Sequence, residues 1–240
     1  MNTKATKDGS HAEGYKTWAD SRGAHAEGQG TKANGDAAHA EGKYTQTDSE
    51  GAHAEGSYVA DADKKPVTRI TKYYKSNPNG VDINIEGGSL AGNRGSHAEG
   101  IRTFAGHEAA HAEGYDTDAV GQASHAEGLQ TIAKGEFSHA EGQGSLADAS
   151  AAHAEGKDTQ ALKNFAHAEG FHTTANGVAA HTEGENTLAD SNGAHAEGTN
   201  IAEFGDVYLP ARSTIYIKSD AEVLINGPVA YNRGSHAEGV

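Results

Sequence analysis

The feature that most constrains the fold of this chain is a tetrapeptide that returns at a fixed interval. His-Ala-Glu-Gly, once in the form His-Thr-Glu-Gly, recurs at a step of fourteen residues within two blocks, His11 to His53 and His97 to His195, and once more at His236. A repeat this strict indicates one supersecondary unit that is stacked on itself, so that each copy buries a face against the next. The copies begin at His11, His25, His39, His53, His97, His111, His125, His139, His153, His167, His181, His195 and His236.

A second half-motif becomes visible when the copies are aligned on their histidines. A threonine usually stands six residues after the histidine and an alanine eight after it, as in Thr17 and Ala19, so the unit reads T-x-A-x-G-x-x-[SA]-H-A-E-G-x-x. Small residues alternate with other types in two short runs, which is the period of two that β-strands show. Glycines stand where the chain must turn. The sequence therefore predicts an all-β solenoid with coils of fourteen residues, two strands per coil, parallel stacking, and Thr, Ala, Ser and Gly inside.

Composition alone would point to a different result. Leu, Ile, Val and Phe number 7, 9, 9 and 5, which is 30 of 240 residues, and the formal net charge is −15. Such a composition is typical of disordered chains, but a solenoid of small residues packs without a large aliphatic core. Cysteine is absent, which excludes disulfides and thiolate metal sites. The acidic balance would repel phosphate, so nucleic-acid binding is not expected.

Two longer intervals interrupt the repeat, 44 residues from His53 to His97 and 41 from His195 to His236. Both contain alternating β-branched and tyrosine residues around turn sequences, which indicates β-hairpin inserts. The predicted organisation is repeats at 1–56, an insert at 57–95, repeats at 96–198, a second insert at 199–234 and the start of a further repeat at 235–240. Four insert tyrosines are candidates for contact with a target, or for clasping a neighbouring subunit: Tyr73, Tyr74, Tyr208 and Tyr216.

The outward positions of the two strands behave differently. The residue between Thr and Ala varies freely, for example Trp18, Phe104 and Leu188, whereas the outward pair on the other strand is His and Glu in every copy. An outward position that never varies is expected to face something equally constant, and another copy of the same chain is the simplest such partner. We therefore predict an interface ladder of His11, Glu13, His25, Glu27, His39, Glu41, His53, Glu55, His97, Glu99, His111, Glu113, His125, Glu127, His139, Glu141, His153, Glu155, His167, Glu169, His181, Glu183, His195, Glu197, His236 and Glu238.

The paired small-residue frames at a fourteen-residue step resemble the YadA-like heads of trimeric autotransporter adhesins. The resemblance covers nearly all of the chain and implies a left-handed parallel β-roll, a homotrimer, hairpin inserts, an extracellular location and binding to a host-cell surface protein or glycan. In that family the outward pair is usually aliphatic and faces the threefold axis, whereas this chain carries residues such as His97 and Glu99 there. Similar HAEG arrays also look like segments of phage tail fibres.

These two settings, a bacterial adhesin head and a tail-fibre segment on a virion, are the main functional alternatives. No secretory leader, coiled-coil stalk, membrane anchor or apolar run long enough to cross a bilayer is visible. Their absence favours the tail fibre if the chain is complete, and is uninformative if the chain is a piece of a longer protein, which its start and end within the repeat suggest.

The chemistry of the ladder leaves further interpretations open. Pairing between imidazolium and carboxylate of neighbouring subunits would supply register, and nearby carboxylates would raise the histidine pKa. His and Glu are also ligands for zinc or nickel, so a metal-binding solenoid is an alternative. Two further interpretations are that the invariant face binds an ice or mineral lattice, and that recent duplication left the residues identical without a function. No group of acids, histidines and serines stands apart from the repeat, so we predict no enzyme, no cofactor and no dedicated metal site.

Overall fold

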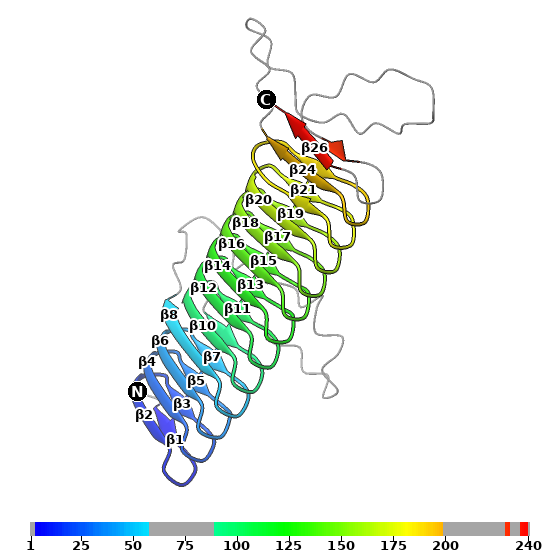
Figure 1. Ribbon diagram of the computed structural model, residues 1–240. Helices are drawn as coiled ribbons and strands as arrows, with labels where there is room; N and C mark the ends of the chain where they lie inside the picture. Colours follow the sequence, from blue (N-terminus) through cyan, green and yellow to red (C-terminus); the bar gives the residue numbers. More distant parts are fainter. Residues whose placement is uncertain (1–2, 58–88, 199–228, 231–235, 240) are drawn as a thin grey trace, which may run out of the picture. The chain divides into compact units, whose positions relative to one another are not determined.

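The computed structural model describes residues 3–57, 89–198, 229–230 and 236–239. Every regular element in these residues is a β-strand, and together the strands form a parallel β-solenoid of about 12 turns with about 14 residues per turn (Figure 1). Each turn contributes one strand of up to five residues that begins at the tetrapeptide histidine, and one of two residues that ends at the following small residue. Within the described residues, no helix is long and apolar enough to span a membrane.

The chain divides into two compact units, Met1–Phe137 and Ser138–Val240. In the first unit the tetrapeptide strands are β2 (His11–Tyr15), β4 (His25–Gln29), β6 (His39–Lys43), β8 (His53–Ser57), β10 (His97–Ile101), β12 (His111–Tyr115) and β14 (His125–Leu129). The short strands of that unit are β1 (Lys4–Ala5), β3 (Trp18–Ala19), β5 (Lys32–Ala33), β7 (Gln46–Thr47), β9 (Leu90–Ala91), β11 (Phe104–Ala105), β13 (Asp118–Ala119) and β15 (Ile132–Ala133).

The second unit repeats the arrangement. Its tetrapeptide strands are β16 (His139–Gln143), β18 (His153–Lys157), β20 (His167–Phe171), β22 (His181–Thr182), β24 (His195–Gly198) and β26 (His236–Gly239). Its short strands are β17 (Leu146–Ala147), β19 (Gln160–Ala161), β21 (Thr174–Ala175), β23 (Leu188–Ala189) and β25 (Val229–Ala230). In both units the two kinds of strand form separate sheets, so each coil places one strand in each sheet.

The register between coils places identical residues opposite one another. Strand β10 pairs in parallel with β12, and His97 lies opposite His111 while Glu99 lies opposite Glu113. The backbone N–H of His97 donates to the carbonyl of Ala110 at 2.9 Å, and equivalent bonds recur at the same place in other coils. The prediction of parallel stacking in coils of fourteen residues is therefore confirmed. The predicted left-handedness and trimeric state stay predictions.

The interior of the solenoid is thin and made of small side chains. The half-motif residues Thr17 and Ala19 and the tetrapeptide residue Ala26 are each 0% exposed. Apart from Leu90, the largest fully buried side chains among the described residues are threonines. Alternation along each strand sends these residues inward and their neighbours outward, as the period of two predicts.

The tetrapeptide glycine is fixed by the approach of the next coil. Gly114 has a φ of +118°, and a Cβ built on it would lie 2.1 Å from the carbonyl oxygen of Gly128. No side chain fits in that space, and L-residues rarely adopt that backbone conformation. Two other turn positions also have positive φ but accept side chains, for example Ala109 (φ +54°) and Asp116 (φ +60°). The alanine and the glycine of the tetrapeptide are thus explained by the fold itself.

The solenoid frame extends into both segments predicted as inserts. Residues Leu90–Ala91 form β9, which pairs with β7 and β11, although they lie within the range 57–95. Likewise Val229–Ala230 form β25 and pair with β23, within the range 199–234. The small residue at the end of each short strand carries the half-motif, which explains this placement. The four insert tyrosines and the predicted hairpins lie outside the described residues.

Candidate functional site: the His/Glu face

The outward residues of the tetrapeptide strands form what we call the His/Glu face. It consists of the described ladder histidines and glutamates, His11 to His125 with Glu13 to Glu127 in the first unit and His139 to His195 with Glu141 to Glu197 in the second. In a typical coil the side chains of His111 and Glu113 are 38% and 47% exposed. Because the fold accounts for the alanine and the glycine but not for these two residues, the face is the candidate functional site.

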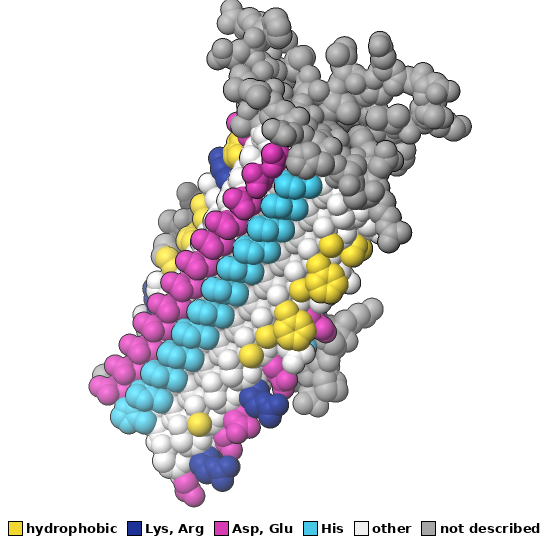
Figure 2. Space-filling view, in the orientation of Figure 1, with side chains coloured by type: hydrophobic (Ala, Val, Ile, Leu, Met, Phe, Trp, Pro, Cys, Tyr) yellow, Lys and Arg dark blue, Asp and Glu magenta, His cyan; other side chains and the backbone are white. Residues whose placement is uncertain are grey.

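Histidines and glutamates stand in two adjacent columns in each unit (Figure 2). Neighbouring imidazoles are stacked, with ring centroids 4.6–4.8 Å apart and interplanar angles of 3–28°. At the first coil the rings of His11 and His25 are tilted by 60°. The spacing of the rings follows the spacing of parallel strands, about 4.8 Å. Within each unit, His therefore lies above His and Glu above Glu.

Each histidine of the face also approaches the glutamate of its own strand. The distance from Nε2 of the histidine to Oε2 of the glutamate is 3.3–3.9 Å in the twelve coils from His11 to His195. These separations are mostly too long for a hydrogen bond. Several Nε2 atoms are enclosed and accept or donate no hydrogen bond, among them those of His39, His53, His97, His167 and His181. The carboxylates nearest to the imidazoles thus come from the same strand.

The electrostatics of a single chain differ from those predicted for the ladder. The pKa values of His39, His53, His153 and His167 are lowered, first by burial and then by the neighbouring histidines. Glutamates of the same and adjacent coils raise these pKa values, but by less than burial and the neighbouring histidines lower them. In the chain by itself these pKa values fall because stacking sets the imidazoles beside one another and partly removes them from water. The raised pKa values expected for pairing between subunits stay a prediction.

The lowered pKa values predict how stability depends on pH. A histidine with a folded pKa below its unfolded value of about 6.5 binds fewer protons when folded, so acidification favours unfolding. This loss of unfolding free energy is absent above the unfolded pKa. It grows as the pH falls below that value, and it is complete below the folded pKa. We expect a lower thermal midpoint at pH 5 than at pH 7.5 under conditions in which the chain is monomeric.

A double variant provides the internal test of that pH dependence. In His39→Gln with His53→Gln, two imidazoles with lowered pKa are lost, and the drop in thermal midpoint between pH 7.5 and pH 5 should shrink. His107→Gln removes an imidazole outside the columns and is the matched control. A wild-type midpoint that rises on acidification would contradict the single-chain electrostatics and would favour carboxylates supplied by a second chain.

The freely varying outward residues of the short strands are less exposed than some residues of the turns. Trp18, Phe104 and Leu188 are half-buried on the short-strand face. The most exposed large apolar side chains are instead Phe137 and Phe165, at 61% and 64%. Both stand two residues before a ladder histidine, at a turn with positive φ. These two turn residues were not predicted as exposed apolar positions, although their constant offset from the histidine is a signal in the sequence.

The histidines outside the register are not part of the face. The side chain of His172 is 46% exposed, and its Nε2 lies 3.1 Å from Oδ2 of Asp158, while its ring stacks on Phe171 at a centroid distance of 4.0 Å. His107 is half-buried, and its Nδ1 accepts the backbone N–H of Glu108 at 2.9 Å.

Comparison with known proteins leaves the fold and the face as the basis for any functional statement. No family model matches the chain, and no curated protein matches it either. The class that the coordinates define is a parallel β-solenoid built from fourteen-residue repeats, with one sheet that exposes stacked histidines beside stacked glutamates.

Proposed function

We propose that the chain is a structural and adhesive segment of an extracellular fibre, in which three copies associate through the His/Glu face. The observation that carries this proposal is the face itself, a column of histidines beside a column of glutamates in each unit (Figure 2), on an otherwise variable surface. Most of its side chains are about one third to one half exposed, so a partner can reach them. The role is mechanical display and attachment, without catalysis and without a cofactor.

Charge complementarity favours a second copy as the partner of this face. Within one chain the imidazoles repel one another once protonated, and the carboxylates stack at the same strand spacing, where like charges are destabilising. An adjacent chain could place its glutamates against these histidines and form charge-assisted hydrogen bonds. Desolvation costs each ion several kcal/mol, so the net gain per pair is small. What the pairs supply is register, since a mispaired layer would leave charges without partners.

The resemblance to trimeric adhesin heads supports the same arrangement. It also supports two settings, a bacterial cell surface and a virion tail fibre, with a host-cell surface protein or glycan as the target. The inserts, with Tyr73, Tyr74, Tyr208 and Tyr216, remain our candidates for target contact. In either setting the solenoid acts as the rigid frame on which these segments are carried.

The proposal is tested by the mass of the untagged chain in solution. Sedimentation equilibrium at neutral pH should give three times 24.7 kDa. Reversing three consecutive charges of the face, Glu99→Lys, Glu113→Lys and Glu127→Lys, should give the monomer mass, because each layer then presents lysine beside histidine. A monomeric wild type, or a variant that stays trimeric, would overturn the proposal.

A matched control distinguishes the effect of charge reversal on the His/Glu face from the effect of the change in net charge. Asp8, Glu50 and Glu136 are exposed and each stands three residues before a ladder histidine, away from the His/Glu face. Replacing these three by lysine makes the same change in net charge as the face variant. The control should remain trimeric, with an unchanged circular dichroism spectrum in both variants.

A further inference from the structure

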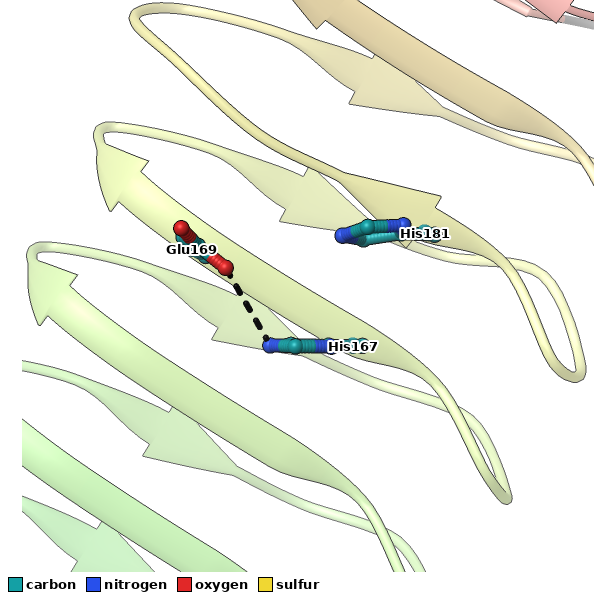
Figure 3. Close-up of side chains that lie close together, drawn as sticks. All are labelled: His167, Glu169 and His181. Carbon is teal, nitrogen blue, oxygen red and sulfur yellow. Dashed lines mark ion pairs between the residues drawn. The ribbon is translucent and has the colours of Figure 1, made fainter.

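Two groups of possible metal ligands lie on the His/Glu face of the second unit. His167, Glu169 and His181 form one group, and His181, Glu183 and His195 form the other; within each, one ligand atom per residue lies within 4.8 Å of the others. Figure 3 shows the first group, with Glu169 next to His167 on β20 and His181 on the adjacent strand β22. The Nε2 atom of His167 lies 3.7 Å from Oε2 of Glu169. Both groups therefore join two coils and share His181.

The shared histidine belongs to the coil that departs from the repeat. Its tetrapeptide is His-Thr-Glu-Gly, and Thr182 occupies the interior position that alanine holds in the other copies. Strand β22 ends at this threonine, so it has two residues where most tetrapeptide strands have five. The side chain of Thr182 is fully buried. The local change in backbone and the two ligand groups thus occur at the same coil.

The donor set suits a divalent transition metal. Zinc binds imidazole nitrogen and carboxylate oxygen at about 2.0–2.2 Å, and three protein ligands with one open position are a recurrent arrangement. In a tetrahedral site such ligand atoms are about 3.3 Å apart. The atoms here, which lie within 4.8 Å of one another, would have to approach by up to about 1.5 Å. Side-chain rotation can supply this because His181 and Glu183 are 35% and 45% exposed.

Hard cations such as Mg²⁺ and Ca²⁺ prefer oxygen ligands. Two imidazoles and one carboxylate therefore select for zinc and its neighbours in the transition series.

We propose that a divalent transition metal ion binds between coils at His181, held by His167, Glu169 and His181 or by His181, Glu183 and His195. The ion would link two successive coils of one chain, at the coil in which the core residue differs. The inference uses the same face as the proposed trimer but needs no second copy, because all ligands come from one chain.

The test is a zinc titration of the untagged protein by isothermal calorimetry at pH 7.5. The wild type should show a saturable site, and His181→Gln should weaken its affinity at least about tenfold, since removing even an outer partner of a ligand costs that much. His111→Gln, in the column of the first unit and outside both groups, should leave that affinity unchanged. Magnesium should not compete.

A spectroscopic measurement keeps the inference testable if His181→Gln misfolds. X-ray absorption at the zinc edge of the wild type should show nitrogen and oxygen neighbours at about 2.0–2.2 Å. No saturable binding to the wild type, or equal loss of affinity in His111→Gln and a folded His181→Gln, would overturn the inference.

Solution mass separates this inference from the trimer. Sedimentation should be repeated with zinc and with a chelator. A monomer that binds zinc at His181 would support the metal site and overturn the proposed trimer. A trimer without saturable zinc binding would support the proposed trimer and overturn the metal site.

Discussion

A Gly114→Ala variant is expected to lose more than about 4 kcal/mol of unfolding free energy, a loss that occurs only when a specific feature of the fold is broken. The added Cβ would lie 2.1 Å from the carbonyl oxygen of Gly128, at a φ of +118°. Neither atom can move by side-chain rotation, because the obstacle is backbone. The coils of β12 and β14 would have to separate, which breaks the parallel hydrogen bonds between them. Thermal unfolding followed by circular dichroism measures the loss.

Gly95→Ala is the matched control for this glycine. Gly95 has a φ of +63°, and a Cβ built on it would meet no atom within 4 Å. The same turn position carries Ala37 and Ala109 in other coils, each with a φ of +54°. Gly95→Ala should therefore lower the unfolding free energy by only about 1–2 kcal/mol, the cost of placing an L-residue in the left-handed conformation. Equal destabilisation by Gly95→Ala and Gly114→Ala would show that the positive φ alone, and not the approach of the next coil, causes the loss of stability.

Ala112→Leu should have the second large effect. Ala112 is 0% exposed and lies between Ala98 and Ala126 of the adjacent coils, which are themselves fully buried. Overpacking typically costs about 1–3 kcal/mol, and the upper end is expected here because the interior offers no larger side chain that could shrink. Chemical denaturation of the wild type and the variant gives the difference.

Tyr115→Leu, on the same strand, controls for the introduced leucine. Tyr115 is 41% exposed, and surface substitutions usually change stability by no more than about 0.5 kcal/mol. If the denaturation midpoint of Ala112→Leu equalled that of the wild type, the interior would have to be wide enough to hold a leucine side chain, in contradiction to the packing described above.

The sequence was sufficient to predict the frame of the molecule. A fixed period determines how coils stack, and small residues at alternate positions, such as Thr17, Ala19 and Ala26, determine which side faces inward. The positions of His and Glu on one outward face follow from the same alternation. Sheet register followed as well, because a repeat that is stacked on itself places identical residues side by side.

The sequence could not predict the environment of the individual side chains. Whether Glu55 raises the pKa of His53 more than burial and stacking lower it depends on separations of a few ångströms. The sequence does not contain those separations. The grouping of ligand atoms at His181 depends on still smaller shifts. Leu90–Ala91 carries the half-motif and joins the solenoid frame although it lies within the predicted insert range 57–95, because that range was bounded by the spacing of the tetrapeptide alone.

Both long interruptions fall at the same point of the repeat, between a tetrapeptide strand and the next short strand. Strand β8 ends at Ser57 and β9 begins at Leu90, while β24 ends at Gly198 and β25 begins at Val229. Strands β8 and β10 nevertheless pair in the usual register, as do β24 and β26. The corner that follows the tetrapeptide strand thus accepts additional sequence at no cost to alignment. The length of the sequence at that point can therefore differ between coils while the strands on either side stay in register.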